Sequence, residues 1–200
     1  MKSGGMKPKH RAYRMGARAE AAADTHRRIL EAAIELFGER PYDEVSLADV
    51  AEAAQVTVQT VLRRFVSKEG LTEAAIARGV EEVRTQRWAA PAGDLDATVQ
   101  GLVEHYEKWG ERSLRFLSQE ERTPAMRELT DAGRALHYEW VDHAFSARLA
   151  SAKGAVRERL RARLVAVTDV AVWKIMRRDL GLSAGATELA LRELVAAVLA

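Results

Sequence analysis

Several residue types and patterns are missing from this chain of 200 residues. It has no cysteine, which excludes disulfide frameworks and cysteine-ligated zinc or iron–sulfur sites. No apolar run approaches the roughly 18 residues of a membrane-spanning helix, and the first residues lack the apolar core of a signal peptide. A cytoplasmic location is therefore expected. A chain of this length buries a real core, so its stability requires no metal or cofactor, and we expect none.

Proline is rare as well, and it is placed between long stretches rich in alanine, leucine, arginine and glutamate. The four prolines are Pro8, Pro41, Pro91 and Pro124. Such composition favours helices, and alternating runs of β-branched residues bounded by turn signals are absent. The sequence therefore predicts an all-α protein.

The formal net charge of +2 hides an asymmetry between the start of the chain and the rest. Residues 1–28 carry eight basic residues against two acidic ones, a net +6, and the remainder carries 23 against 27, a net −4. A basic arm before a mildly acidic body indicates an anionic partner such as nucleic acid. Charge alone supports a solvated, disordered leader segment as well as it supports an arm that binds nucleic acid.

Three helices are predicted in the first third of the chain. The first covers about 24–39, where Ile29, Ala33 and Phe37 lie on one face, and it ends before Pro41. The second follows Ser46, which forms a capping signature with Asp49. The third follows Thr57, and its inward positions are expected to be Val58, Val61, Leu62 and Phe65. Further helices are expected at about 70–88, 95–117, 124–150, 155–180 and 184–199.

Two short helices joined by a tight turn and preceded by another helix match the helix-turn-helix arrangement. In that arrangement the second helix enters the DNA major groove. At 100° per residue, the outward positions of the third predicted helix are Thr57, Gln59, Thr60, Arg63 and Arg64. They are hydroxyl, amide and guanidinium groups with no acid among them, so they suit phosphates and base edges. Gln59 is the best candidate for a base contact, whereas either arginine could also be an ordinary solvated residue.

The segments RILEAAIELFG (28–38), VSLADVA (45–51) and VTVQTVLRRFVSKEGL (56–71) resemble the DNA-binding domain of the TetR, or tetracycline repressor-like, family. The resemblance covers about 25–75. It implies a homodimeric bacterial transcription factor, usually a repressor, whose variable C-terminal domain binds a small effector. By position, it implies phosphate contacts by Ser46 and Lys68. It places Thr57, Val58, Gln59 and Thr60 at the start of the recognition helix that faces the groove.

Two positions depart from the family pattern. Leu62 stands where the family usually has a tyrosine that reaches a phosphate, and Val66 stands where proline is common. Leucine cannot donate that hydrogen bond, so Arg63 or Arg64 is expected to replace it. Val58 is apolar and suits either a thymine methyl group or the core.

The predicted organisation has three parts: a basic, flexible N-terminal arm at 1–22, a helix-turn-helix domain at 23–70, and a helical effector-binding and dimerisation domain at 71–200. From residue 71 onward the chain has 19 basic and 19 acidic residues, so charge recruits no nucleic acid there. The candidate effector pocket is Tyr106, Trp109, Leu117, Met126, His137, Trp140 and Val141, for each of which core packing is the alternative. The candidate dimer interface is Leu164, Thr168, Val172, Leu191, Val195 and Val198.

The sequence predicts a ligand-responsive, sequence-specific DNA-binding regulator that is not an enzyme. We expect a repressor that a small molecule releases from a double-stranded operator. The alternatives are an activator or effector-free DNA-binding protein of the same fold, and a helical small-molecule-binding or enzymatic domain with a vestigial helix-turn-helix. Gly181, Ser183 and Gly185 fit a hydrolase G-x-S-x-G pattern, but a helix is expected before the serine where a hydrolase needs a strand, so no catalytic residue is assigned.

Overall fold

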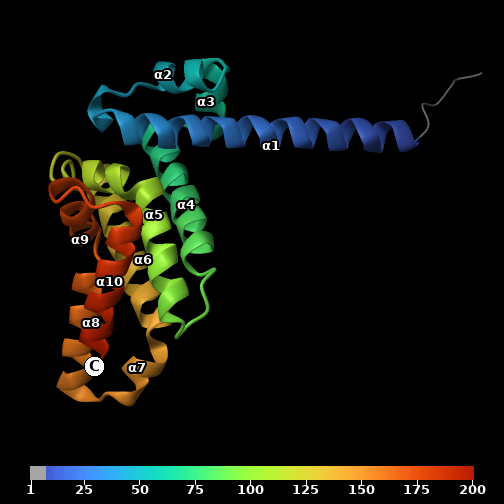
Figure 1. Cartoon of the computed structure of the whole chain (residues 1–200). Coiled ribbons are helices and arrows are strands. Elements are labelled where there is room, and N and C mark those ends of the chain that lie inside the picture. The colour runs from blue at the N-terminus through green and yellow to red at the C-terminus, as the bar shows by residue number, and fades with distance from the viewer. Residues whose placement is uncertain (1–7) are drawn as a thin grey trace, which may run out of the picture. The chain divides into compact units, whose positions relative to one another are not determined.

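A computed structural model describes residues 8–200, and residues 1–7 of the predicted arm lie outside the described part. Within residues 8–200 the secondary structure consists of helices, without a strand (Figure 1). This confirms the all-α prediction. The chain divides after Ala75 into two compact units, and the helix α4 (Lys68–Arg87) continues from the first unit into the second.

The first unit is built on one long helix, α1 (Pro8–Glu39). It begins about four turns before the predicted start at residue 24, so residues 8–22 of the predicted arm are helical. The alanine-rich sequence explains the extension, because alanine has the highest helix propensity and proline is tolerated in a first turn. Among the side chains of α1 that the structure describes, Ile29 is the first buried one. The side chains of residues 18–24, by contrast, are exposed.

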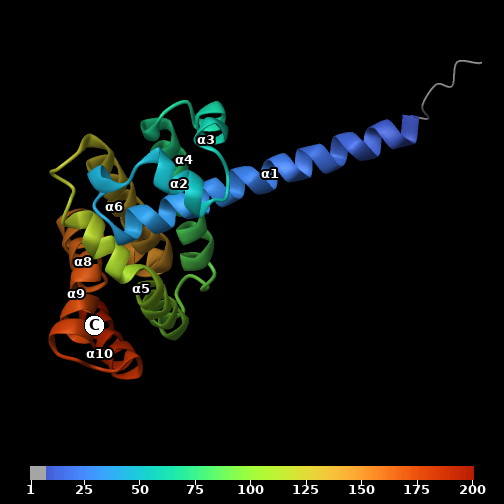
Figure 2. The ribbon, with the colours of Figure 1, turned by 90° about the horizontal axis from the view of Figure 1, so that it is seen from above.

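The remaining helices of the first unit pack on the second half of α1 (Figure 2). They are a single 3₁₀ turn (Tyr42–Glu44), α2 (Leu47–Ala53), α3 (Val58–Phe65) and the start of α4. Buried apolar side chains come from α1 and from these elements, and the rings of Phe37 and Tyr42 are 5.2 Å apart. Among these buried side chains are Ile29, Phe37, Tyr42, Val45, Val50, Val61, Phe65 and Leu71.

The second unit is a set of packed helices after residue 75. It contains the rest of α4, α5 (Leu95–Leu117), α6 (Pro124–Ala144), α7 (Ser146–Ser151), α8 (Gly154–Val167), α9 (Val170–Lys174), a π-helical turn (Ile175–Asp179) and α10 (Ala184–Leu199). Figure 1 shows α8 beside α10, and α5 contacts α6, α9 and α10. The helix α5 is therefore the centre of this unit.

Two tryptophans fill the core of the second unit. Trp140 is 2% exposed and Trp173 is 1% exposed. The ring of Trp173 lies so close to Gly110 that a Cβ atom there would come within 2.5 Å of it. Glycine at this position lets α9 approach α5, because any side chain would overlap the indole ring.

Two predicted helices are each interrupted. The prediction of one helix over 124–150 is wrong, since Phe145 leaves helical geometry between α6 and α7 and buries its ring against Trp140. The prediction of one helix over 155–180 is wrong as well. Thr168 ends α8, and the Asp169 carboxylate accepts a hydrogen bond from Ala171 N to cap α9. Neither break contains proline or glycine, the usual sequence signals of a helix end.

The loop before α10 has the structure expected for a helix boundary. Gly181 has a φ of +69°, which glycine adopts without strain. The Ser183 hydroxyl accepts a hydrogen bond from Ala186 N at 3.1 Å and caps α10. Because a helical turn precedes this serine, the G-x-S-x-G pattern does not form a strand–turn–helix nucleophile elbow.

Candidate nucleic-acid interface

The helix α3 is anchored by two buried side chains and capped at its start. Val61 is fully buried and Phe65 is 7% exposed, and His26 of α1 stacks on the Phe65 ring with centroids 4.9 Å apart. The Thr57 hydroxyl accepts a hydrogen bond from Thr60 N at 3.2 Å. These contacts hold α3 on the first unit and leave its other face to solvent.

A tight turn joins α2 to α3. Ser46 and Asp49 form a reciprocal capping box at the start of α2, as the sequence predicts. At its other end Gln55 adopts a positive φ of 54°, and Arg28 of α1 donates a hydrogen bond to the Ala54 carbonyl oxygen at 2.8 Å. The turn is therefore held to α1 as well as to α2, which sets the direction in which α3 leaves it.

The outward residues predicted on α3 lie on its surface to different degrees. Thr57, Gln59 and Arg63 are exposed, and Thr60 is half-buried. Arg64 is also half-buried, and its Nε is covered without a hydrogen-bond partner. The helix contains arginines in its last turn and no acidic residue, so its exposed face carries no negative charge that would repel phosphates.

Two apolar positions of α3 differ from the inward set that was predicted. Val58 is 38% exposed, so its methyl groups reach the surface beside Gln59. Leu62, where the resemblance expects tyrosine, is half-buried. The first turn of α3 thus offers an apolar contact next to an amide, a pair that suits a thymine methyl and an adenine edge.

The two residues predicted to contact phosphates already have partners within the protein. The Ser46 hydroxyl donates to Asp49 Oδ2 at 2.7 Å, and Lys68 Nζ donates to the Tyr42 carbonyl oxygen at 2.6 Å and lies over the Tyr42 ring. Partial burial lowers the pKa of Lys68 below its ordinary value. An ammonium group has three donors, so Lys68 retains capacity for a phosphate.

The turn after α3 has a backbone conformation that proline cannot adopt. Val66 has φ 68° and ψ −48°, whereas the pyrrolidine ring requires a φ near −65°. A proline therefore does not fit the turn in this conformation. Its side chain is 82% exposed and stabilises no core.

The candidate effector residues all lie in the second unit, and most are buried. Tyr106, Trp140 and Val141 belong to one core cluster, against which Leu117 packs, and His137 stacks on Trp140 with centroids 5.8 Å apart. Met126 is 1% exposed, and Trp109 is half-buried beside Lys108 and Arg112.

A buried polar network passes through this cluster. Arg87 Nη2 lies 3.1 Å from His137 Nδ1, and His137 Nε2 lies 3.2 Å from the Val165 carbonyl oxygen. The Tyr106 hydroxyl donates to the Thr168 carbonyl oxygen at 2.8 Å. Because an arginine N–H can only donate, His137 Nδ1 must accept, and the ring is neutral with its proton on Nε2. The network joins α4, α5, α6 and α8.

Burial and the positive charge of Arg87 both lower the pKa values of the two buried histidines of this region, His105 and His137. Burial, helped by Arg87, lowers the pKa of His137 to about 4. The same two causes lower the pKa of His105 well below its ordinary value. Arg87 was not predicted as a site residue, because the position of an arginine near the end of a charged helix does not indicate that its side chain is only 6% exposed.

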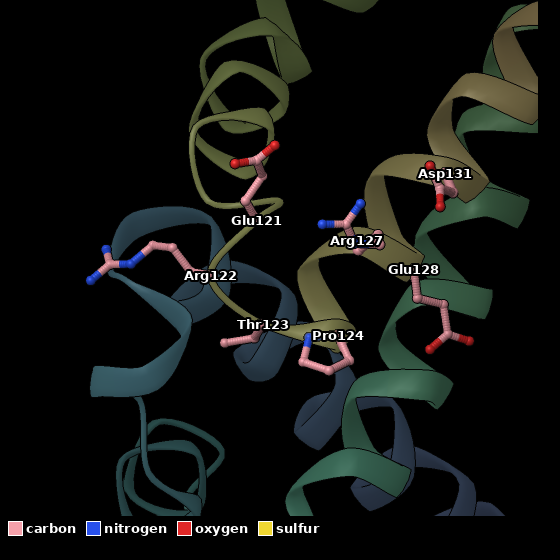
Figure 3. Close-up of a pocket in the computed structure, with 7 residues that line it drawn as sticks. All are labelled: Glu121, Arg122, Thr123, Pro124, Arg127, Glu128 and Asp131. Carbon is pink, nitrogen blue, oxygen red and sulfur yellow. The ribbon is translucent and has the colours of Figure 1, made fainter.

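A surface hollow lies elsewhere, where α5 ends and α6 begins (Figure 3). Its lining residues are Glu121, Arg122, Thr123, Pro124, Arg127, Glu128 and Asp131. Thr123 caps α6, and the charged side chains around it are of both signs. None of the predicted effector residues lines this hollow.

Most of the predicted dimer-interface residues lie inside the chain itself. Leu164, Thr168, Leu191 and Val195 are at most 1% exposed, whereas Val172 and Val198 are half-buried. The helical period shows which residues of one helix share a face, but it cannot tell which partner covers that face. The large apolar side chains that α8 and α10 leave exposed are Val156, Leu189 and Leu194.

Among the side chains that the structure describes, no group of three or more histidine, aspartate or glutamate residues is placed to hold a metal ion. In the same residues, no helix combines the length and the hydropathy required to cross a membrane.

Comparison with known proteins supports the same domain. Residues 29–75 match the family described as bacterial regulatory proteins, tetR family. The regulatory protein RaaS of Mycobacterium tuberculosis, an HTH-type transcriptional regulator, is 46% identical over 65 residues, which are 32% of this chain and 30% of that protein. The uncharacterized HTH-type transcriptional regulator YdeS of Bacillus subtilis is 32% identical over 133 residues, which are 65% of this chain and 62% of that protein. The chain thus spans less than two thirds of the length of each of these relatives.

Solved structures extend the likeness in fold to the second unit. GusR of Salmonella enterica has a TM-score of 0.67 and 20% identity, with 88% of this chain and 95% of that chain covered. A transcriptional regulator from Saccharomonospora viridis, solved in complex with choline, has a TM-score of 0.61 and 20% identity, with 87% and 96% covered. At such identities the likeness concerns the fold alone. The matched family model and the helix-turn-helix geometry lead to one conclusion: residues 29–75 form a DNA-binding helix-turn-helix domain of the TetR family of transcriptional regulators.

Proposed function

We propose that this protein is a homodimeric repressor that binds a double-stranded DNA operator in the bacterial cytoplasm and leaves it when a small molecule binds the second unit. The observation that carries the proposal is the surface of α3. Gln59 and Arg63 are exposed there on a helix without acidic residues, anchored by the buried Val61 and Phe65. Such a surface suits the major groove.

Binding to the DNA upstream of the protein's own gene tests the DNA-binding part. We expect a gel shift with this DNA, and we expect Gln59→Ala and Arg63→Ala each to weaken it by about 1 to 3 kcal/mol. Gln100→Ala and Arg157→Ala remove the same residue types from exposed positions of the second unit and should bind like the unchanged protein. Full binding by both α3 variants would contradict the assignment of α3 as the recognition helix.

Dimerisation is supported by the apolar side chains that α8 and α10 leave uncovered. Val156, Leu189 and Leu194 are 55%, 53% and 41% exposed, and α8 and α10 pack on each other. A second copy would cover them and place two recognition helices about one turn of DNA apart, roughly 34 to 36 Å. Sedimentation should give a dimer, and Leu189→Glu together with Leu194→Glu should give monomers that bind the operator weakly. A monomeric unchanged protein would contradict this part.

Response to an effector is supported by the interior of the second unit. The aromatic and polar side chains of Tyr106, His137 and Trp140 meet there, and a protein of similar fold was solved with choline. An effector that prefers a dimer whose two α3 helices do not match the operator half-sites would shift the population away from the operator-bound form. If a molecule that stabilises the protein leaves its operator affinity unchanged, the protein is an effector-independent regulator. Transcription from the operator promoter, measured with and without the protein, separates a repressor from an activator.

A further inference from the structure

One charged side chain in the second unit is buried with one of its donor atoms, Nε, covered and without a partner. Arg87, in the last turn of α4, is 6% exposed. Its guanidinium group has five N–H donors, but its single side-chain hydrogen bond joins Nη2 to His137 Nδ1. The Nε atom is fully covered and has no partner. A buried guanidinium group in this condition is costly unless something else compensates it.

No carboxylate of residues 8–200 forms an ion pair with Arg87. Arg84, one turn earlier, pairs with Glu139 at 2.7 Å. The nearby acid Asp169, which acts on the Arg87 charge, uses its carboxylate to cap α9. Burial accordingly lowers the pKa of Arg87 to about 10, in the direction expected for a charge that lacks a counter-ion.

Other arginines of the chain show what the unused edge of Arg87 is suited to hold. Arg161 binds Asp142 through Nε and Nη2, at 2.7 and 2.9 Å, and Arg177 binds Glu107 in the same manner. On Arg87 this edge has an empty Nε and a neutral histidine at Nη2. A carboxylate would satisfy Nε and would replace the bond to a neutral acceptor by a bidentate ion pair, the geometry that arginine and carboxylate favour.

The surroundings of the guanidinium group are aromatic and apolar. The Trp140 ring centroid is 3.9 Å away and the Tyr106 centroid 6.0 Å away. Buried Leu102, Val141 and Leu164 belong to the same core cluster as these rings. The histidines are neutral, so the site offers one positive charge among hydrocarbon surfaces. A monoanion with an apolar body matches this chemistry, whereas a dianionic phosphate would remain uncompensated.

We propose that Arg87 is the anchor for the effector and that the effector is a hydrophobic carboxylate, aryl or alkyl, whose two oxygens take the Nε and Nη2 edge. This inference rests on the proposed function, since it names the chemical class of the effector. Binding exchanges the Arg87–His137 bond for the carboxylate. His137 also bonds to Val165 of α8, so its release changes the connection between α6 and α8.

Thermal unfolding of the full chain at pH 7 tests the inference, with benzoate and octanoate as probes and their primary amides as neutral controls. We expect the acids, at concentrations well above their dissociation constants, to raise the melting temperature by several degrees. The amides, which lack the charge, should raise it little. Arg87→Met should remove the difference between acid and amide. Arg84→Met removes an arginine of the same helix that already has a carboxylate partner, and it should keep the full difference.

A second variant, which keeps the positive charge, tests the inference even if Arg87→Met does not fold. Arg87→Lys presents one ammonium in place of the two-pronged edge and should weaken binding of the acids about tenfold or more. Equal shifts with acid and amide, an unchanged shift in Arg87→Met, or no shift with either acid would each overturn the inference.

The failure of the inference and the failure of the proposed function can be told apart with an operator gel shift. If tetramethylammonium, a small cation, releases the operator while the acids neither bind nor release it, the effector response stands and the anion inference is wrong. If an acid binds through Arg87 and the operator complex persists, the inference on Arg87 chemistry stands and the effector-responsive function is wrong.

Discussion

The two units use their polar side chains in opposite ways. In the first unit the groups proposed to act, Gln59 and Arg63 among them, lie on the outside of α3, while apolar Val61 and Phe65 hold the helix in place. In the second unit the polar groups Arg87 and His137 lie inside, among tryptophan and tyrosine rings. A surface for a large, hydrated polyanion needs no burial, but recognition of a small molecule does, and the proposals for the two units rest on this difference.

The largest effect on stability is expected in the core of the second unit. Trp173→Ala removes a side chain that is 1% exposed, and its indole N–H donates to Glu107 at 2.9 Å. Loss of this packing should lower the free energy of unfolding by about 3 to 5 kcal/mol in denaturant titrations. Trp173→Phe keeps most of the volume and should cost clearly less. Equal losses in the two variants would show that the hydrogen bond to Glu107 matters more than the packing.

The buried histidine should make the second unit sensitive to acid. The folded pKa of His137, about 4, lies below the value of 6.5 of an unperturbed histidine, so between these values the unfolded chain binds a proton that the folded chain does not. Stability is therefore complete above pH 6.5 and is lost as the pH falls toward 4, by about 3 kcal/mol for this group.

Denaturant titrations at pH 7 and pH 4.5 measure this loss. His137→Phe cannot take up the proton, so its stability should fall less between these two pH values than that of the unchanged protein. If both proteins lost the same amount, His137 would not be the cause of the acid sensitivity.

In the first unit a comparable test concerns the capping box at α2. Ser46→Ala removes the acceptor for Asp49 N and the hydroxyl that binds the Asp49 carboxylate, and it should cost about 1 kcal/mol. Ser46→Thr keeps the hydroxyl and should stay close to the unchanged protein. Operator binding, measured under conditions in which both variants are fully folded, then reports any phosphate contact of this hydroxyl separately from its effect on stability.

The smallest predicted effect concerns the turn of the helix-turn-helix. Gln55 has a positive φ, which glycine adopts without a steric penalty, so Gln55→Gly should stabilise the protein by a few tenths of a kcal/mol to about 1 kcal/mol. Gln59 lies within α3, and Gln59→Gly should cost about 1 kcal/mol. Thermal unfolding of the two variants measures the difference. A loss of stability in both would mean that Gln55 is not strained.

Periodicity and capping signals predicted much of the helical structure. The expected helices 95–117 and 184–199 coincide with α5 and α10, and Ser46, Thr57 and Ser183 are the caps. The start of α1 and the breaks at Phe145 and Thr168 were not predicted. A break without proline or glycine depends on which distant surface a side chain reaches, and Phe145 leaves the helix where its ring packs on Trp140.

The amino-acid sequence by itself determined the fold class, the helix-turn-helix and the outward position of Thr57, Gln59 and Arg63. These depend on neighbours within a few residues, which spacing along the chain describes. Tertiary structure alone decided that Arg87 is buried without a carboxylate partner and that Leu164, Leu191 and Val195 belong to the chain's own core. Burial depends on helices that are far apart in the sequence, and the helical period shows which residues share a face but not what covers that face.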